Sequence, residues 1–389
     1  MKPYSVYLLE AGCPVEPPVF PKGVPSSLFP FWGHYCFYDF AAANLSGAPE
    51  GCVQVIGESR FRGLPEIVSG RSPAFCVQLL DDGPAGLQRL AAADPAEKVL
   101  IYPLSQVFLA DPGALLQRLE RPAAEVTRLS VDNTATDLYL VRRRTLLRLL
   151  KDSRPGKAEA APDLGSHLNR LLAGNFEVID DLPGLALFQN SLMQMYAGNL
   201  QLCVELGSSE LESRFALLDR GHMPGGDIRI ERGGTVKSSF LAAGTVVEGY
   251  VEGSVLFPGV SVRRGAMVYQ SIVMSGNCIG TKAQVSRALI LPHFGENGGG
   301  SPRSRQGAAN IGEDAFIGLR SSSAVNLQYP TQLREGLTVL GAGVQVPRGF
   351  TIGPACLVGA EVSPQQLRGI KELRKGTTVL CNTRPSANS

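Results

Sequence analysis

The sequence has no long apolar run and almost no net charge, and each absence excludes a class of protein. No segment reaches the roughly 18 apolar residues of a membrane-spanning helix, and the run from Tyr4 to Leu9 is too short for a signal peptide. The 37 basic residues are nearly balanced by 35 acidic ones, which leaves a net charge of +2. A surface that binds nucleic acid usually needs a clear basic excess. We therefore expect a soluble cytoplasmic protein that binds neither membrane nor nucleic acid.

The cysteines and histidines form no motif of their own. The eight cysteines include no CxxC pair, and they have no metal-ligand spacing with the four histidines. Cys278 and Cys356 fall among the apolar positions of the repeat described next, where a thiol packs as a small hydrophobe. This usage is typical of reduced, intracellular cysteine and predicts neither a disulfide framework nor a metal site.

What the chain does contain is a repeat of six residues in its C-terminal half. Apolar residues recur at this interval, with a one-residue slip before Ile279 and two longer interruptions, at Leu256, Val262, Val268, Met274, Ile279, Val285, Leu291, Ile311, Ile317, Val346, Ile352 and Val358. A hexapeptide repeat is the signature of a parallel β-helix, in which each coil buries its apolar face by stacking on its neighbours. We expect a left-handed β-helix of hexapeptide repeats.

The N-terminal half instead alternates two patterns. Short apolar runs predict buried strands at 6–9, 53–56, 75–79 and 99–102, and helical spacing predicts helices at 87–93, 115–119, 145–151, 167–172 and 192–202. Asp111 precedes Pro112 at the start of one such helix and is expected to cap it. Strands that alternate with helices predict a mostly parallel sheet in an α/β fold.

These patterns divide the chain into four parts. We expect an α/β domain over 1–205, a linker over 206–227, the β-helix over 228–363 with an external loop at 292–310, and a C-terminal tail over 364–389. In the tail, a short helix is predicted at 364–374 and a last strand at 377–381.

Three segments carry a resemblance to a known family. The stretch from Leu28 to Asn44, the stretch from Asp137 to Asp152 and the stretch from Gly184 to Leu202 resemble, in this order, segments of ADP-glucose pyrophosphorylases (glucose-1-phosphate adenylyltransferases). That family joins a nucleotidyltransferase-like, Rossmann-like domain to a hexapeptide β-helix, the layout expected here. The resemblance implies adenylyl transfer from ATP to glucose 1-phosphate, with Mg²⁺ as cofactor.

Several positions depart from the family pattern where the reaction needs donors and carboxylates. The glycine-rich phosphate loop is replaced by a segment with four prolines between 14 and 21, which lack the N–H groups that bind phosphate. Leu104 stands where the family has a metal-binding Asp, the second carboxylate is missing from 186–190, and Cys36 replaces an Arg. Ile56 and Gly57 stand where a nucleotide-facing Thr-Gln is usual, and about forty family residues before Asp137 are absent.

The departures predict a chain without catalytic or metal-binding residues. We expect a regulatory or structural subunit, similar to the noncatalytic type of the family in bacterial glycogen synthesis. Mg²⁺ is expected only if residual transfer exists. The expected partner is a catalytic pyrophosphorylase subunit or a further copy of this chain, with a sugar phosphate or nucleotide as a possible ligand. The alternatives are an active sugar-nucleotide nucleotidyltransferase with a diverged site, or a hexapeptide acyltransferase in which His293 is the general base.

Two groups of residues are candidates for ligand contacts. Lys22, Asp39, Asn44 and Gly83 match family positions near the nucleotide, although local hydrogen bonding or a solvated loop also explains them. Cations of the repeat and its loop are candidates for an anionic effector site, with solvated surface as the alternative, at Arg263, Arg264, Lys282, Arg303 and Arg305.

Overall fold

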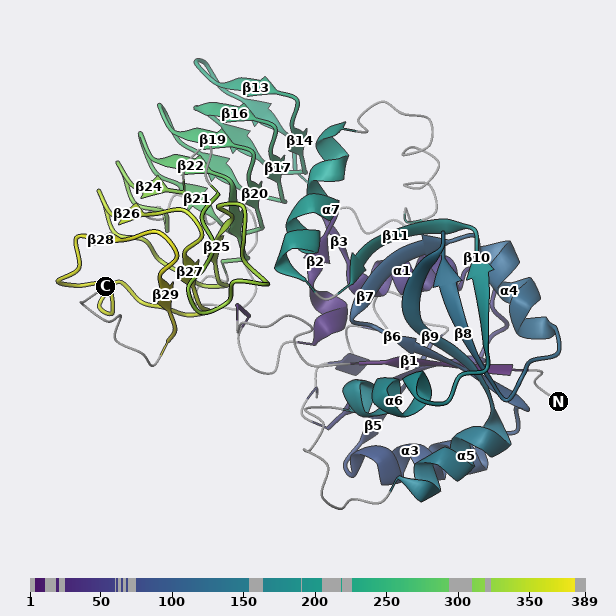
Figure 1. The fold of residues 1–389 in the computed structure, drawn as a ribbon. Helices are drawn as coiled ribbons and strands as arrows, with labels where there is room; N and C mark the ends of the chain where they lie inside the picture. The colour runs from purple at the N-terminus through teal and green to yellow at the C-terminus, as the bar shows by residue number, and fades with distance from the viewer. Residues whose placement is uncertain are drawn as a thin grey trace. The chain divides into compact units, whose positions relative to one another are not determined.

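The computed structural model describes most of the chain. The described residues are 4–10, 19–20, 25–59, 61, 64–65, 68, 75–153, 164–189, 191–204, 218, 226–293, 310–318 and 323–381. Lys22, Arg303 and Arg305, most of the predicted linker and most of the predicted loop at 292–310 lie outside these residues. The described residues form two compact units (Figure 1).

The first unit is built on a seven-stranded sheet with the strand order β10-β8-β9-β6-β1-β4-β5. Neighbours in the sheet are parallel except for β9, which is antiparallel to both β6 and β8. The strands are β1 (Tyr4–Leu9), β4 (Val53–Glu58), β5 (Cys76–Leu80), β6 (Lys98–Pro103), β8 (Val126–Val131), β9 (Thr134–Arg142) and β10 (Val178–Leu182). The mostly parallel α/β sheet predicted from the sequence is confirmed.

Helices cover both faces of this sheet (Figure 1). Strands buried on both faces carry continuous apolar runs, as Val6 to Leu9 does. One face packs against α1 (Phe37–Asn44) and α4 (Pro112–Glu120), and the other packs against α3 (Gly83–Ala93), α5 (Arg143–Asp152) and α6 (Leu164–Ala173). Asp111 accepts a hydrogen bond from Ala114 N at 2.6 Å, so the predicted cap of α4 is confirmed. A separate antiparallel pair joins β7 (Gln106–Ala110) to β11 (Gly184–Gln189).

The second unit is the parallel β-helix. Its three walls are parallel sheets, consistent with the left-handed winding expected from the hexads. The first wall is β12 (Arg229–Ile230), β15 (Val246–Val247), β18 (Ser261–Val262) and β21 (Cys278–Ile279), extended by single bridges through Ile311 to Val346. The second is β13 (Thr235–Lys237), β16 (Tyr250–Glu252), β19 (Met267–Tyr269), β22 (Gln284–Ser286), β24 (Phe316–Ile317), β26 (Thr351–Ile352) and β28 (Glu372–Leu373). The third is β14 (Phe240–Leu241), β17 (Val255–Leu256), β20 (Ile272–Val273), β23 (Ala288–Ile290), β25 (Thr338–Leu340), β27 (Leu357–Val358) and β29 (Thr378–Val379).

The one-residue slip in the hexad count has a structural cause. The turn between the second and third walls is one residue shorter than a hexad, so Val273 and Ile290 occupy the apolar core, not the neighbouring Met274 and Leu291. The short turn places one residue of each coil in the left-handed region, as at Gln270 (φ 43°) and Arg287 (φ 46°). The predicted repeat is right, but the slip recurs in every coil from Ser238 to Arg287.

The C-terminal tail differs from its prediction. The helix expected at 364–374 is wrong, because Pro364 to Gly369 form successive turns and Glu372–Leu373 is strand β28. Leu373 and Val379 enter the β-helix core as a further coil, and the last strand predicted at 377–381 is confirmed as β29. Leu373 and Val379 are six residues apart, so they continue the hexad repeat, although the stretch from 364 to 374 also has helical spacing.

The second unit also gathers three segments from outside the repeat. These are helix α7 (Leu192–Val204), the described residues Val19 and Phe20, and the segment Pro30–Tyr35, which contains strand β2 (Pro30–Phe31) and the first residue of β3 (Tyr35–Cys36). Tyr196 donates from its hydroxyl to Gln270 O at 2.6 Å, which fixes α7 along the short-turn corner of the β-helix. The predicted domain boundary at 205 would have assigned α7 to the first unit.

Candidate functional site

The carboxyl ends of β1, β4 and β6 form the position where a sheet of this kind binds a ligand. In the sheet, β1 lies between β4 and β6. The chain continues from β1 to β4 on one side and later reaches β6 on the other side, so the carboxyl end of β1 is a topological switch point. Glu10 directly follows β1, Gly57 is the corresponding residue of β4, and Leu104 follows β6 and donates to Leu9 O at 2.9 Å. We call Glu10, Gly57 and Leu104 the switch-point residues.

The switch-point residues are buried and offer little to a phosphate. Glu10 is 1% exposed, and its carboxylate accepts a hydrogen bond from Ser27 N at 3.2 Å. A β-carbon added at Gly57 would lie 3.5 Å from the β-carbon of Glu10 and 3.0 Å from Leu64. The segment that replaces the phosphate loop is described only at Val19 and Phe20, and there Val19 O accepts from Ala342 N of the β-helix at 2.8 Å.

The residues at the family's metal positions do not fit Mg²⁺. Mg²⁺ requires oxygen ligands, usually carboxylates. Leu104 is fully buried and has no oxygen in its side chain, and the side chains of Ala186 and Leu187 on β11 also lack oxygen. Within the described residues, no group of three or more His, Cys, Asp or Glu side chains is arranged to hold a metal ion.

Helix N-termini at the same edge of the sheet already carry carboxylates. Asp82 is the N-cap residue of α3, and its two oxygens accept from Arg89 at 2.7 and 2.8 Å. This ion pair lowers the pKa of Asp82. Glu58, at the end of β4, accepts from Leu164 N at the start of α6 at 3.1 Å. A helix N-terminus attracts an anion, and here side chains of the chain itself supply one.

The matched residue Gly83 lies in this carboxylate-rich region. It is the first residue of α3, with φ at 51°, and open space surrounds the position of an added β-carbon. A phosphate that approached it would also approach Asp82. Its role in nucleotide binding stays a prediction.

Asp39 and Asn44 both make structural hydrogen bonds within the first unit. Asp39, in the first turn of α1, accepts from Cys36 N at 2.8 Å. Asn44 is 1% exposed and donates from Nδ2 to Tyr102 Oη and to Phe108 O, both at 2.8 Å. Its Oδ1 accepts from Ala110 N at 2.8 Å, so Asn44 ties the end of α1 to two strands. These contacts are the local hydrogen bonding expected as the alternative, and a role of Asp39 or Asn44 in nucleotide binding stays a prediction.

A second polar cluster at this edge was not anticipated from the sequence. Asp137 on β9 accepts from Gln106 Nε2 at 2.8 Å and lies 3.6 Å from Arg128 Nη2, while Tyr139 Oη donates to Asn169 Oδ1 at 3.2 Å. Burial raises the pKa of Asp137, and the nearby Arg128 and Asn169 oppose that rise. The cluster joins residues from four elements, and only the position of Asp137 in a strand gave any sequence signal.

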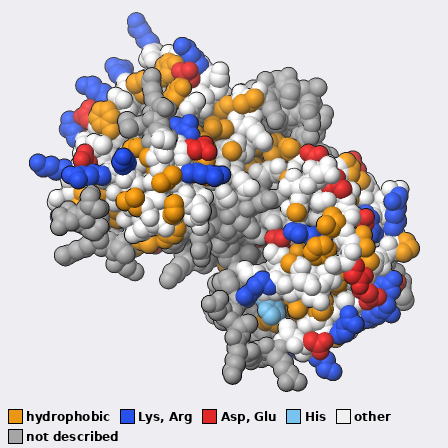
Figure 2. Space-filling model, in the orientation of Figure 1, with side chains coloured by type: hydrophobic (Ala, Val, Ile, Leu, Met, Phe, Trp, Pro, Cys, Tyr) orange, Lys and Arg blue, Asp and Glu red, His pale blue; other side chains and the backbone are white. Residues whose placement is uncertain are grey.

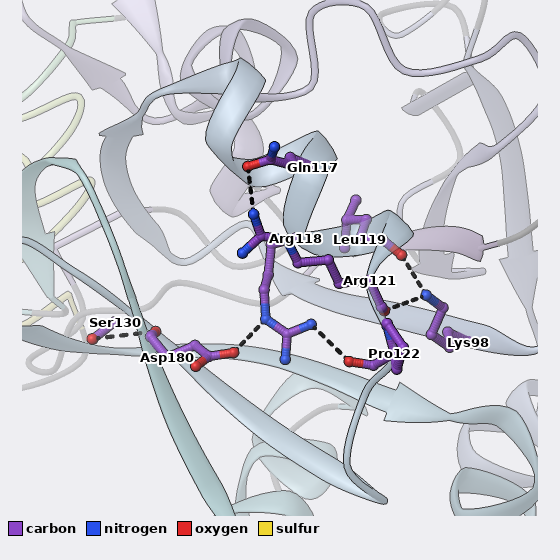
Figure 3. Close-up of polar contacts among 8 residues, drawn as sticks. All are labelled: Lys98, Gln117, Arg118, Leu119, Arg121, Pro122, Ser130 and Asp180. Carbon is purple, nitrogen blue, oxygen red and sulfur yellow. Dashed lines mark hydrogen bonds and ion pairs between the residues drawn. The ribbon is translucent and has the colours of Figure 1, made fainter.

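Several cations of the first unit are committed to helix α4 and its neighbours (Figure 3). Lys98 donates from Nζ to Leu119 O at 2.6 Å and to Arg121 O at 2.8 Å, which satisfies carbonyls at the end of α4. Arg118 pairs through Nε with Asp180, and Ser130 Oγ lies 3.4 Å from Asp180 O. Burial lowers the pKa of Lys98. Lys98 and Arg118 therefore bind other groups of the first unit, and neither is available for a ligand.

The described cations proposed for an effector site meet on one corner of the β-helix. Lys282 N donates to Arg264 O at 3.2 Å, so the two residues occupy successive coils, and Arg263 Nε lies 3.4 Å from Cys278 Sγ. The corner is not uniformly basic, because the next coil contributes Glu313 and Asp314, which lie 3.7 and 3.4 Å from guanidinium nitrogens of Arg348.

Mixed charge is also visible on the molecular surface. Figure 2 shows acidic and basic side chains interspersed over the described part of the face that it presents. The fold brings Arg263, Arg264 and Lys282 together on one corner of the β-helix. Their binding of an effector stays a prediction.

His293 is the last described residue before 310. Its backbone N–H donates to Ser275 O at 2.9 Å, and its carbonyl lies so close to Gly276 that an added β-carbon would be 1.9 Å away. These contacts position the backbone of His293 and say nothing of a general base, so that role also stays a prediction. Among the described helices, none combines the length and apolar character that a membrane crossing requires.

Comparisons with known proteins agree with this architecture. A family model described as a GlmU-like C-terminal hexapeptide matches residues 228–293. A glucose-1-phosphate adenylyltransferase from Acetivibrio thermocellus is 30% identical over 138 residues, which cover 34% of this chain and 28% of the relative. The enzyme of the same name from Thermomicrobium roseum is 31% identical over 99 residues (25% and 20%), and that from Bacillus thuringiensis strain Al Hakam is 46% identical over 55 residues (14% and 15%).

These matches confirm the resemblance predicted from the sequence. The chain is similar to glucose-1-phosphate adenylyltransferases and carries a hexapeptide domain. The similarity is partial, since the matches span less than a third of the length of each of these relatives.

Proposed function

We propose that this chain is a catalytically impaired relative of glucose-1-phosphate adenylyltransferase that serves as a regulatory or structural subunit. The observation that carries the proposal is the composition of the switch point. A buried carboxylate follows β1, and a leucine follows β6, where adenylyl transfer would need phosphate donors and a metal ligand.

The reaction would place several negative charges at this position. Glucose 1-phosphate attacks the α-phosphorus of ATP in line, and the transition state is stabilised by preorganised donors, cations and Mg²⁺. A carboxylate about 4 Å from a phosphate oxygen opposes it by about 4 kcal/mol at an effective dielectric constant near 20. Glu10 and Glu58 lie at the ends of β1 and β4, where a carboxylate acts in this unfavourable direction.

The β-helix supplies the surface for the remaining role. Its described strands stack from β12 to β29, and they share an apolar core. A stacked solenoid presents extended side walls on which a partner subunit or an effector can bind. A catalytic adenylyltransferase subunit, or a second copy of this chain, is the partner we propose.

Mixing the chain with a catalytic adenylyltransferase subunit from the same cell tests this role. Size-exclusion chromatography with light scattering should show a joint complex. The mixture should also differ from the catalytic subunit alone in KM for ATP or in its response to sugar phosphates. Failure to associate, together with unchanged kinetics, would rule out the regulatory role.

The acyltransferase alternative is tested separately. If His293 were a general base, the chain would acylate a sugar nucleotide with acetyl-CoA, and His293→Ala would abolish that reaction. The proposed function predicts that neither the native chain nor His293→Ala acylates a sugar nucleotide.

A further inference from the structure

The apolar core of the β-helix reaches the surface at the end formed by its first coil. Among the described strands, β12, β13 and β14 each have a sheet neighbour on one side only, and Figure 1 shows β13 and β14 at one end of the stack. One residue of each of these strands is paired in register with a core residue of the next coil: Ile230, Val236 and Leu241. These three side chains therefore continue the core rows into the first coil.

The inward residues of the first coil are much more exposed than those of the next coil. Ile230 is 55% exposed, whereas Val247, its partner in the next coil, is fully buried. Ile228, two residues earlier on the same wall, is 49% exposed, and Val236 and Leu241 are only partly buried. We call Ile228, Ile230, Val236 and Leu241 the open-end residues.

The opposite end of the same core is closed. Leu367, Leu373 and Val379 are the last core residues along the chain, and they are 2%, 3% and 0% exposed. A terminal repeat that faces water usually carries a polar outer surface. The first coil instead presents apolar side chains together with strand edges, which is typical of a surface that another strand covers.

The charges on β12 favour a second copy of this chain as the covering partner. Arg229 and Glu231 flank Ile230, and both are exposed. A two-fold rotation that stacks two first coils reverses the strand direction, so β12 would lie antiparallel to β12 of the second copy. With Ile230 opposite Ile230, Arg229 of each copy lies opposite Glu231 of the other. Opposite charges directly across an antiparallel pair are stabilising.

We propose that the open-end residues bind the same surface of a second copy of this chain, with β12 paired to β12 across a two-fold axis. The same rotation places β13 opposite β14 of the second copy, so Val236 and Leu241 gain apolar neighbours. Two identical coils match along all three walls, because they share one cross-section. The inference rests on the proposed function as a structural subunit and names its partner and surface.

Sedimentation equilibrium of the full chain over a concentration series tests the contact. Ile230→Glu places two carboxylates opposite each other on the two-fold axis. Ile179→Glu is the matched control, because Ile179 on β10 of the first unit is 58% exposed, close to the value for Ile230. Thermal unfolding of each variant establishes that it is folded.

We expect the native chain and Ile179→Glu to self-associate with the same Kd. Ile230→Glu should raise the Kd by at least about tenfold, since it buries an unpaired charge in the contact.

A charge exchange on β12 tests the register. Arg229→Glu alone and Glu231→Arg alone should each weaken association by about tenfold, because each places like charges opposite one another. The double variant Arg229→Glu/Glu231→Arg restores opposite charges and should return the Kd to within about threefold of the native value.

Three results would overturn the inference: a native chain that stays monomeric, an Ile230→Glu variant that associates as tightly as Ile179→Glu, or a double variant as weak as the single ones. A monomeric native chain that still binds a catalytic subunit would refute only pairing with a second copy. ADP-glucose formation by the native chain would refute the proposed function and leave the measured masses unchanged.

Discussion

Individual polar side chains in the first unit are matched to specific donors and acceptors. Asp94 is 6% exposed and accepts from Ser5 Oγ at 3.0 Å, from Tyr7 Oη at 2.7 Å and from Ala96 N at 2.9 Å. Burial and the contact with Asp94 raise the pKa of Tyr7. Buried polar groups stabilise a fold only when they are paired in this way.

Asn44 allows a direct test of a structural role. Replacing it with Ala removes three buried hydrogen bonds and leaves Phe108 O and Ala110 N without that partner. We expect Asn44→Ala to lower the free energy of unfolding by about 2–4 kcal/mol in urea denaturation. Asn175→Ala, which removes one exposed contact to Leu171 O, should change it by less than about 0.5 kcal/mol. Equal changes in unfolding free energy for the two substitutions would contradict the structural role of the Asn44 hydrogen bonds.

Glu125 predicts a pH dependence. Hydrogen bonds from Arg144 and Thr145 lower its pKa to about 2. The pKa is depressed in the folded state, so the stabilisation is present above the unfolded value of about 4.3 and is lost as the pH falls toward 2. The native chain should therefore melt at a higher temperature than Glu125→Gln at pH 7, and the difference should disappear near pH 2. A difference that persists unchanged at pH 2 would exclude this origin.

Residue-level prediction from the sequence succeeded where the signal was local. Asp111 before Pro112 identified a helix cap, and its carboxylate is found at Ala114 N. The cluster around Asp137 was missed because it joins residues far apart in the chain, and no spacing marks them. Glu10 was missed as a site residue for the same reason, since its importance depends on Ser27 and Leu104 beside it.

At the level of elements, the short turn of the β-helix explains both the slip in the sequence and a hydrogen-bonded ladder. The residue after each left-handed position is Ser239, Ser254 or Ser271 in three successive coils. Ser254 N donates to Ser239 Oγ at 3.1 Å, and Ser271 N donates to Ser254 Oγ at 3.0 Å. The repeat was predicted from apolar periodicity, but the ladder depends on which residues lie inside the turn.

The other two corners of the β-helix each offer a glycine, and this pair separates backbone strain from steric contact. Gly276 (φ 86°) and Gly233 (φ 95°) both have left-handed backbones, but only at Gly276 would an added β-carbon meet an atom, His293 O at 1.9 Å. We expect Gly276→Ala to cost about 3 kcal/mol or more of unfolding free energy, and Gly233→Ala about 1 kcal/mol. Similar costs in denaturant unfolding would mean that the corner yields to the added atom.

At the level of the whole molecule, each of the two units is built from segments that are not continuous in sequence. The segment Pro30–Tyr35 lies early in the sequence but belongs to the unit of the β-helix. Trp32 N donates to Asn199 Oδ1, and Trp32 Nε1 donates to Gly198 O, both at 2.9 Å. Apolar patterning predicted the two folds, but it cannot predict that a short segment leaves one for the other.

Trp32 is the single tryptophan of the chain, so its fluorescence reports on the second unit. Ile352→Ala in the β-helix core should lower the unfolding free energy by about 2–5 kcal/mol and shift the denaturant midpoint of Trp32 fluorescence accordingly. The exposed substitution Arg348→Ala should leave the midpoint nearly unchanged. A fluorescence midpoint that does not respond to Ile352→Ala would place Trp32 outside this unit.

The central claim is that the switch point no longer supports adenylyl transfer. The most direct measurement is ADP-glucose formation by the pure chain with ATP, glucose 1-phosphate and Mg²⁺, compared with a catalytic glucose-1-phosphate adenylyltransferase under the same conditions. The buried carboxylate of Glu10 and the side chain of Leu104 predict no rate above the protein-free background. Turnover by the pure chain at a rate comparable to that of the catalytic enzyme would contradict the account.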